Sequence, residues 1–403
     1  MIQLFEMAIR NLERNRRRTF LSVLAVSIGL ALLLLIAAIL NGEMGGALQN
    51  SIQIQSGDLQ IRAASYDENK VSLDWKDLVA DPQQVIDQLK TIPQVTVATP
   101  RLFATGILTL GENSRGVQVI GIDPASPANQ IFREGLLSGA FLTPDDREGI
   151  LIGKPLADKL GVKVGDQISL LVNTSNGDVS TQLFSVRGIY TTNTSSYDEG
   201  TVFMPLIKAQ AITDAQDHAS TIFIMLQNRD QADAVAAALK SPDYQILTWR
   251  TMNDLIVQTE DFANAFLVFV YLIVLGITAT VVTNTLIMAV FERTREIGVL
   301  SAIGMKGRRI TAQFLTEGGL IAIGGVIGGL ILGAIAVAYF SRFGISVASA
   351  KVTGILMRDT IYANLTLSDT IALTIVTLVV TIIASIYPAM LAAQMEPVEA
   401  LHG

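Results

Sequence analysis

The distribution of apolar and polar positions divides the chain into four long uncharged runs and one long alternating stretch. The runs cover about Phe20 to Leu40, Phe262 to Phe291, Gly318 to Phe340 and Thr370 to Met395. A helix needs roughly 20 apolar residues to cross a bilayer. One such run could be a buried core helix, but four in one chain favour membrane spans. We therefore expect transmembrane helices at 19–41, 262–291, 311–340 and 370–395.

Between the first two spans, residues 42–261 contain short runs in which apolar and polar positions alternate, separated by residues typical of turns. Strands are predicted at Leu59–Arg62, Gly116–Ile120 and Gln182–Val186. Helical periodicity appears at Pro82–Lys90, Lys154–Leu160 and Gln231–Leu239. The pair Asn176-Gly177 predicts a β-hairpin, because both central residues of such a turn must tolerate positive φ. We expect a mixed α+β domain with two subdomains.

Composition supports a membrane protein and excludes several chemistries. Half of the 403 residues are apolar and 16% are charged. The absence of cysteine excludes disulfides and thiolate metal sites, and two histidines make a histidine-built metal site improbable. The acidic pairs Asp145-Asp146 and Asp198-Glu199 lack further ligands and are interpreted as solvated loops. We predict no catalytic site and no metal site.

The charge distribution predicts the orientation. Five arginines precede the first span, and five Lys or Arg residues lie between spans two and three. Residues 42–261 carry a net charge of −11, against +4 for the rest. Positive loops stay in the cytoplasm. We expect residues 1–18, 292–310 and the tail 396–403 to be cytoplasmic, and 42–261 and 341–369 to lie outside.

Two cytoplasmic segments have helical periodicity. Ile2, Phe5, Ile9 and Leu12 share one face of a basic amphipathic helix that would lie on the inner leaflet, unless it is a plain positive flank. In the segment from Glu292 to Gly304, Ile297, Leu300 and Ile303 share a face beside Arg293, Arg295 and Glu296. Docking into a groove of a soluble partner and an ordinary charged loop are equally compatible with this pattern.

The third span is rich in glycine. Gly324, Gly325, Gly328, Gly329 and Gly333 include pairs four residues apart, a spacing that lets helix backbones approach closely in lipid. We predict that these residues pack helices together. Glu317 begins this span and is expected to form an ion pair with Arg308 or Arg309, with proton transfer as the alternative.

Several segments together resemble FtsX/MacB-type ABC permeases. They are "MAIRNLERNRRRTFLSVLAVSIG", "ILIGKPLADKLGVKVGDQISL", "MAVFERTREIGVLSAIGMKGRRI" and "YPAMLAAQMEPVEALHG", in that order along nearly the whole chain. The resemblance implies four transmembrane helices with a MacB-type periplasmic core domain between the first two. It also implies an inner-membrane protein with both termini in the cytoplasm.

The same resemblance implies how the protein would be driven. Glu292–Gly304 would be the coupling helix, contacting a separate ATP-binding subunit. ATP and Mg²⁺ would be bound and used by that subunit, because the printed sequence contains no Walker A pattern. A second permease subunit, identical or related, would complete a dimer. One departure is Ser301, where relatives usually carry a basic residue, so docking would have to use Arg293, Arg295 or Arg308.

Within the family, the lipoprotein-releasing (LolC/LolE) branch fits best, through the stretch "GIYTTNTSSYDEGTVFMPL". It implies extraction of lipoproteins or lipids from the outer leaflet and transfer to a periplasmic carrier, without nucleic acid. In that case Asn173, Asn176 and Gly177 are candidate carrier contacts. MacB-like efflux by mechanotransmission and FtsX-like regulation of a cell-wall hydrolase remain as alternatives.

Overall fold

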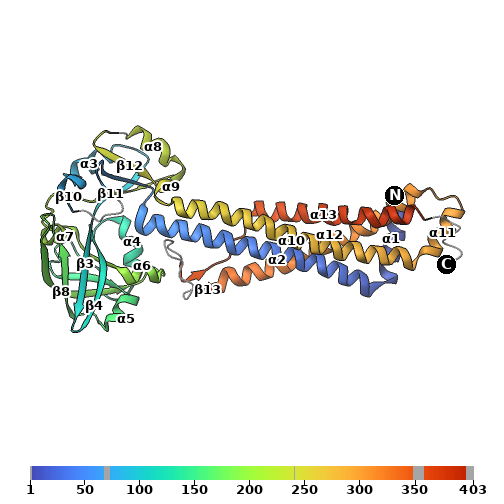
Figure 1. Ribbon diagram of the computed structural model, residues 1–403, viewed down its shortest axis with the longest axis horizontal. Helices are drawn as coiled ribbons and strands as arrows, with labels where there is room; N and C mark the ends of the chain where they lie inside the picture. Colours follow the sequence, from blue (N-terminus) through green and yellow to red (C-terminus); the bar gives the residue numbers. More distant parts are fainter. Residues whose placement is uncertain (1, 68–72, 240, 348–357, 396–403) are drawn as a thin grey trace. The chain divides into compact units, whose positions relative to one another are not determined.

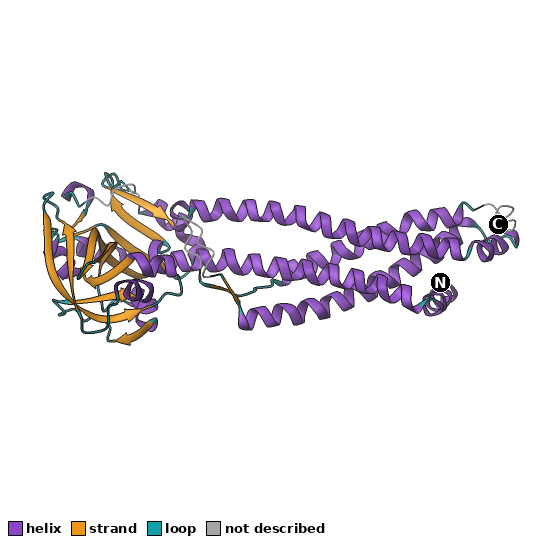
Figure 2. Cartoon of the chain, turned by 60° about the horizontal axis from the view of Figure 1, so that its bottom comes forward, coloured by secondary structure: helices purple, strands orange, loops and turns teal. Residues whose placement is uncertain are grey.

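The computed structural model describes residues 2–67, 73–239, 241–347 and 358–395, with side chains from residue 5 onward. The chain divides into two compact units. One unit comprises residues 1–44, 260–345 and 361–403 and consists of long helices (Figure 1). The other comprises residues 45–259 and 346–360 and holds nearly all the strands (Figure 2). We call them the helical unit and the strand unit.

Four long apolar helices form the helical unit, as predicted. They are α2 (Arg16–Ser51), α10 (Asp254–Glu292), α12 (Gly307–Phe343) and α13 (Leu367–Ala393), and each contains a stretch apolar enough to cross a membrane. Helices α2, α10 and α12 extend beyond the predicted apolar runs at both ends, because polar residues continue the helix, whereas α13 begins three residues before its predicted run and ends two residues short of it. The predicted tail 396–403 lies outside the described residues.

The four helices meet in one core. Leu30 and Leu34 of α2, Leu275 of α10, Val326 of α12 and Leu373 of α13 are buried together. Two short helices complete the unit: α1 (Ile2–Arg14) precedes α2, and α11 (Thr294–Ala302) lies between α10 and α12. Phe5 and Ile9 on α1 are exposed, whereas Ala8 is fully buried.

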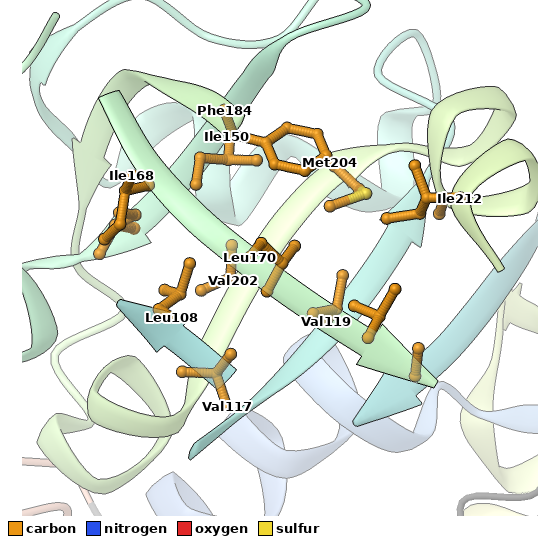
Figure 3. Close-up of a cluster of buried hydrophobic side chains, with 14 of the residues drawn as sticks. Leu108, Val117, Val119, Ile150, Ile168, Leu170, Phe184, Val202, Met204 and Ile212 are labelled. Carbon is orange, nitrogen blue, oxygen red and sulfur yellow. The ribbon is translucent and has the colours of Figure 1, made fainter. Parts of the chain in front are cut away.

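The strand unit contains a closed barrel. Its strands run in the order β3 (Val95–Leu110), β4 (Asn113–Ile122), β9 (Thr201–Pro205), β6 (Gly149–Gly153), β8 (Val179–Tyr190) and β7 (Gln167–Asn173). The ring closes because β7 pairs with both β8 and β3. Alternate side chains of these strands fill the interior, among them Leu108, Leu170 and Phe184 (Figure 3).

A second layer extends the same sheet. The first half of β3 pairs with β11 (Thr221–Leu226), which pairs with β1 (Leu59–Ala63), and β1 pairs with β12 (Tyr244–Thr248). Helices α3 (Pro82–Leu89) and α8 (Ala232–Ala238) cover this layer and bury Val85 and Val235 in its core. Strand β3 therefore belongs to both the barrel and this second layer, and a third buried cluster of the unit includes Phe132, Tyr190 and Phe203. The remaining helices and strands are short: β2 (Val79–Ala80), α4 (Gln130–Glu134), β5 (Leu136–Gly139), α5 (Lys154–Leu160), α6 (Ser195–Gly200), α7 (Leu206–Ile212), β10 (His218–Ala219), α9 (Trp249–Met252), β13 (Ile345–Ser346) and β14 (Thr360–Ile361).

The predicted hairpin is present but its turn differs. Strands β7 and β8 pair from Gln167↔Ser185 to Asn173↔Val179, and residues 174–178 connect them. Gly177 has φ +84°, whereas Asn176 does not have a positive φ. The amide of Thr174 donates to the carbonyl of Asp178 at 2.9 Å, so a five-residue loop replaces the tight two-residue turn.

Candidate functional site

The sequence-predicted coupling segment forms a short helix between two long ones. Glu292 is the last residue of α10, Arg293 lies between the helices, and α11 follows. The turn after α11 uses Gly304, whose φ of +95° is readily adopted only by glycine. This turn leads the chain into α12 at Gly307.

Helix α11 has a buried face and an exposed face. Ile297 is 4% exposed and packs with Val290, Ile310 and Phe314 in the bundle. Leu300 is half-buried, whereas Val299 is 42% and Ile303 80% exposed. The three residues expected on one docking face are therefore divided: Ile297 holds α11 on the bundle, and Ile303 with Val299 forms the exposed apolar surface.

Ion pairs hold the start of α11 to the N-terminal helices. Arg14 contacts the Glu296 carboxylate with both terminal nitrogens, at 2.9 and 3.2 Å. Glu292 accepts from Arg18 at 2.6 Å and from Asn15 at 2.9 Å. Exposed pairs of this kind contribute about 0–1 kcal/mol each. Their geometry orients the α10–α11 junction more than it stabilises the fold.

A buried ion pair lies directly beneath this junction. Arg293 Nη1 contacts Glu317 Oε1 of α12 at 3.0 Å, and the two side chains are 5% and 2% exposed. Asn11 of α1 donates its side-chain amide to the same oxygen at 2.6 Å, and its carbonyl accepts from Arg293 Nη2 at 3.0 Å. Helices α1, α10 and α12 therefore meet at one charge cluster.

This cluster corrects one expectation. The partner of Glu317 is Arg293, not Arg308 or Arg309, because the chain reversal through α11 returns α12 alongside the end of α10. Arg293 lies inside the bundle at 5% exposure, so its predicted contact with the ATP-binding subunit stays a prediction. Arg295, Lys306, Arg308 and Arg309 are exposed, and within the described part of the chain none of them forms an ion pair.

The predicted glycines of α12 lie against α2. A Cβ added at Gly325 would be 2.4 Å from Val26 Cβ, and one at Gly328 would be 2.4 Å from Ser27 Oγ. At Gly329 and Gly333 the nearest atoms belong to Leu30 and Leu34, both at 2.8 Å. Gly324 is less crowded, with 3.5 Å to Val23. Ser27 Oγ also donates to the Gly325 carbonyl at 3.0 Å. Two helix backbones thus approach closely along this line.

An exposed apolar face runs along α10. Phe262, Phe266, Phe269, Ile273 and Ile277 are all exposed and recur every three or four residues, so they lie on one side of the helix. Such a face is costly in water and suits acyl chains or another helix.

The remaining candidates lie in the strand unit. Asn173, Asn176 and Gly177 are exposed at the β7–β8 loop. Asp146 pairs with Arg187, and Lys159 contacts Glu199. Asp198 was interpreted as part of a solvated loop, which is wrong: it is fully buried in α6 because Thr191 and Thr192 donate hydrogen bonds to its carboxylate, and burial raises the pKa of that carboxyl. Among the described residues, no cluster of three His, Cys, Asp or Glu side chains could hold a metal.

Asn11, Asn15 and Arg18 were not predicted as site residues from the sequence. The acids at 292, 296 and 317 follow the N-terminal basic stretch by almost 300 positions, so only the fold shows that they are neighbours. The sequence does carry one indication of these contacts. Three acidic residues lie next to apolar spans, and acidic residues in such positions are usually paired with basic residues of the same chain.

Two family models match the chain and agree with this architecture. Residues 19–241 match the family model described as MacB-like periplasmic core domain, and residues 268–397 match the one described as FtsX-like permease C-terminal. The lipoprotein-releasing system transmembrane protein LolC of Xylella fastidiosa is 24% identical, over 98% of this chain and 97% of its own length. The macrolide export ATP-binding/permease protein MacB of Acinetobacter baylyi is 23% identical, over 98% of this chain. This chain spans 59% of that MacB. The crystal structure of the periplasmic region of MacB from Actinobacillus actinomycetemcomitans has a TM-score of 0.36 at 14% identity, covering 52% of this chain and 97% of that one.

A membrane-embedded bundle of four apolar helices with a separate α+β core domain is the architecture of an ABC transporter permease subunit. The chain belongs to the family of FtsX-like permeases with a MacB-like periplasmic core domain.

Proposed function

We propose that this permease extracts lipoproteins or lipids from the outer leaflet of the inner membrane, driven by a separate ATP-binding subunit, and passes them to a periplasmic carrier. The observation that carries the proposal is the end-to-end match with a lipoprotein-releasing transmembrane protein, which covers 98% of one chain and 97% of the other. The exposed apolar face of α10 supports it, because a lipid-anchored cargo needs an apolar surface beside the bilayer.

The charge distribution supports an orientation. The basic ends of α1, α2 and α12 would lie in the cytoplasm, and the acidic strand unit would lie outside the inner membrane. In that orientation α11 faces the cytoplasm. Its exposed Val299 and Ile303, flanked by the exposed Arg295 and Lys306, would contact the ATP-binding subunit.

The contacts within the helical unit suggest how a movement of α11 is transmitted. Glu296 and Glu292 connect the α10–α11 junction to Arg14 and Arg18, and Arg293 connects it to Glu317 of α12. A force applied to Ile303 would therefore move α1, α10 and α12 together, with α2 following α12 through the glycine contacts.

Extraction is tested by reconstituting the chain with its ATP-binding subunit, a second permease subunit and a triacylated lipoprotein in lipid nanodiscs. We expect ATP to release the lipoprotein to a soluble carrier, measured by mass spectrometry of the supernatant. ATP hydrolysis without release of lipoprotein or lipid would contradict the proposal. It would favour MacB-like efflux, which the match with a macrolide export protein supports as the second candidate.

The Ile303→Asp substitution tests the docking surface of α11. Ile303 is 80% exposed, so the fold should be unaffected, whereas a carboxylate in an apolar partner groove is expected to weaken ATPase binding about 30-fold, the effect of losing an interface hot spot. Binding is measured by copurification and by permease-stimulated ATP hydrolysis. The matched control is Ile207→Asp on α7, which is 70% exposed in the strand unit. Equal binding by both variants would place the docking surface elsewhere.

A further inference from the structure

A cavity in the strand unit contains a buried arginine that forms no ion pair with a carboxylate in the described part of the chain. The cavity has a volume of about 280 Å³ and is lined by residues from η1 (Ile52–Ser56), β1, β3, β4, α6 and the start of α10. Arg101 of β3 lines it and is 1% exposed. Among the described residues that line the cavity there is no aspartate or glutamate.

The contacts of Arg101 leave one edge of its guanidinium unused. Nη1 donates to the Ile54 carbonyl at 2.8 Å, and the flat face lies 3.8 Å from the ring centroid of Phe223. Nε and Nη2 have no hydrogen-bond acceptor among the described residues. These two nitrogens form the edge that binds carboxylate or phosphate through two parallel hydrogen bonds.

Burying the charge of Arg101 without an anion beside it lowers the stability of the fold. Burial lowers the pKa of Arg101 to about 10, so the side chain still carries its charge at neutral pH. An uncompensated buried charge is strongly destabilising, and proteins normally pair it or bind an ion of opposite sign. The planar ring of Phe223 offsets only part of this cost.

Other groups at the cavity suit an anion. The Tyr197 hydroxyl is buried and makes no well-formed hydrogen bond among the described residues, with the Thr201 side chain as its nearby polar neighbour. Burial raises the pKa of Tyr197, so the hydroxyl keeps its proton and can donate it in a hydrogen bond. Arg62 adds a second cation to the lining, held by Gln60 at 2.8 and 3.0 Å.

We propose that this cavity binds an oxyanion, a carboxylate or phosphate group, through Nε and Nη2 of Arg101 and the Tyr197 hydroxyl. The apolar lining residues Phe103, Ile120 and Leu255 leave room for a small apolar part beside the charged group. The ligand is therefore either a free small anion or the headgroup of a lipid. The proposal does not depend on the proposed function, because every residue that carries it lies within the strand unit.

The test is a calorimetric titration of the full chain in detergent at constant ionic strength. Inorganic phosphate, acetate and dihexanoyl-phosphatidic acid are added in separate arms. We expect saturable binding that Arg101→Met weakens by about 30-fold or more, and Tyr197→Phe by about tenfold. Binding of phosphate or acetate identifies a free anion, and binding of the phosphatidic acid alone identifies a lipid headgroup.

The controls are Arg115→Met, an exposed arginine outside the cavity, and Tyr244→Phe on β12, a half-buried tyrosine that does not line it. Thermal unfolding without added anion checks the fold of each variant. The unfolding temperature of Arg101→Met should equal or exceed that of the wild-type chain, because the substitution removes a buried charge. If Arg101→Met fails to fold, the proposal is tested by whether Tyr197→Phe weakens anion binding about tenfold. No saturable binding in any arm, or equal binding by wild type and the cavity variants, would overturn the proposal.

Discussion

Replacing Arg293 by Met is expected to lower the free energy of unfolding by about 3–5 kcal/mol. The substitution leaves the Glu317 carboxylate 2% exposed and without its cation, and breaking a buried pair by removing one partner has an effect of this size. Asn11 still donates to Glu317, but one neutral amide does not balance a buried charge. The measurement is thermal or denaturant unfolding of the purified chain in a fixed detergent.

Two further variants separate the charge effect from other causes. Arg18→Met removes an exposed ion pair with Glu292 and should lower the free energy of unfolding by about 0–1 kcal/mol. Arg293→Met combined with Glu317→Leu should be less destabilising than Arg293→Met alone, because no charge is then left unpaired. Equal losses for Arg293→Met and Arg18→Met would show that the buried cluster does not stabilise the helical unit.

Gly325→Leu is expected to destabilise the helical unit by about 3 kcal/mol, at the upper end of the effect of overpacking. Even the first carbon of the new side chain would be 2.4 Å from Val26 Cβ, so α2 and α12 must separate. Separation also breaks the hydrogen bond from Ser27 to the Gly325 carbonyl. Unfolding in detergent measures stability, and ATP-driven release measures whether the separated helices still transmit motion.

The control for this prediction lies on the same helix. A Cβ at Gly319 has no heavy atom of a neighbouring side chain or helix within 4 Å, so Gly319→Leu should be neutral or slightly stabilising through helix propensity. If both leucine variants were equally stable, close approach of α2 and α12 would not matter for the fold.

Elements whose stability depends on local interactions could be predicted from the amino-acid pattern. A long uncharged run can only be buried in lipid or protein, and its backbone groups are satisfied within one helix, so α2, α10, α12 and α13 were predictable one at a time. The strands around Leu59, Gly116 and Gln182 could also be predicted from local sequence, because apolar and polar residues alternate along them and turn residues flank them. Glycine spacing indicated the packing face of α12 because close helix contact needs small residues.

Contacts between residues far apart in the sequence could not be predicted in this way, because they depend on the complete fold. Ile297 and Ile303 have the same apolar chemistry, and the packing of α11 on Ile310 and Phe314 is what buries the first and exposes the second. The partner of Glu317 depended on how α10 and α12 lie against each other, since several arginines were within reach by sequence. Closure of the barrel required β7 to pair at both edges, and Arg101 is buried where β3 pairs with β11 on one side and β4 on the other. Such contacts are non-local, so their free energies depend on the whole fold and leave no periodic signal in the chain.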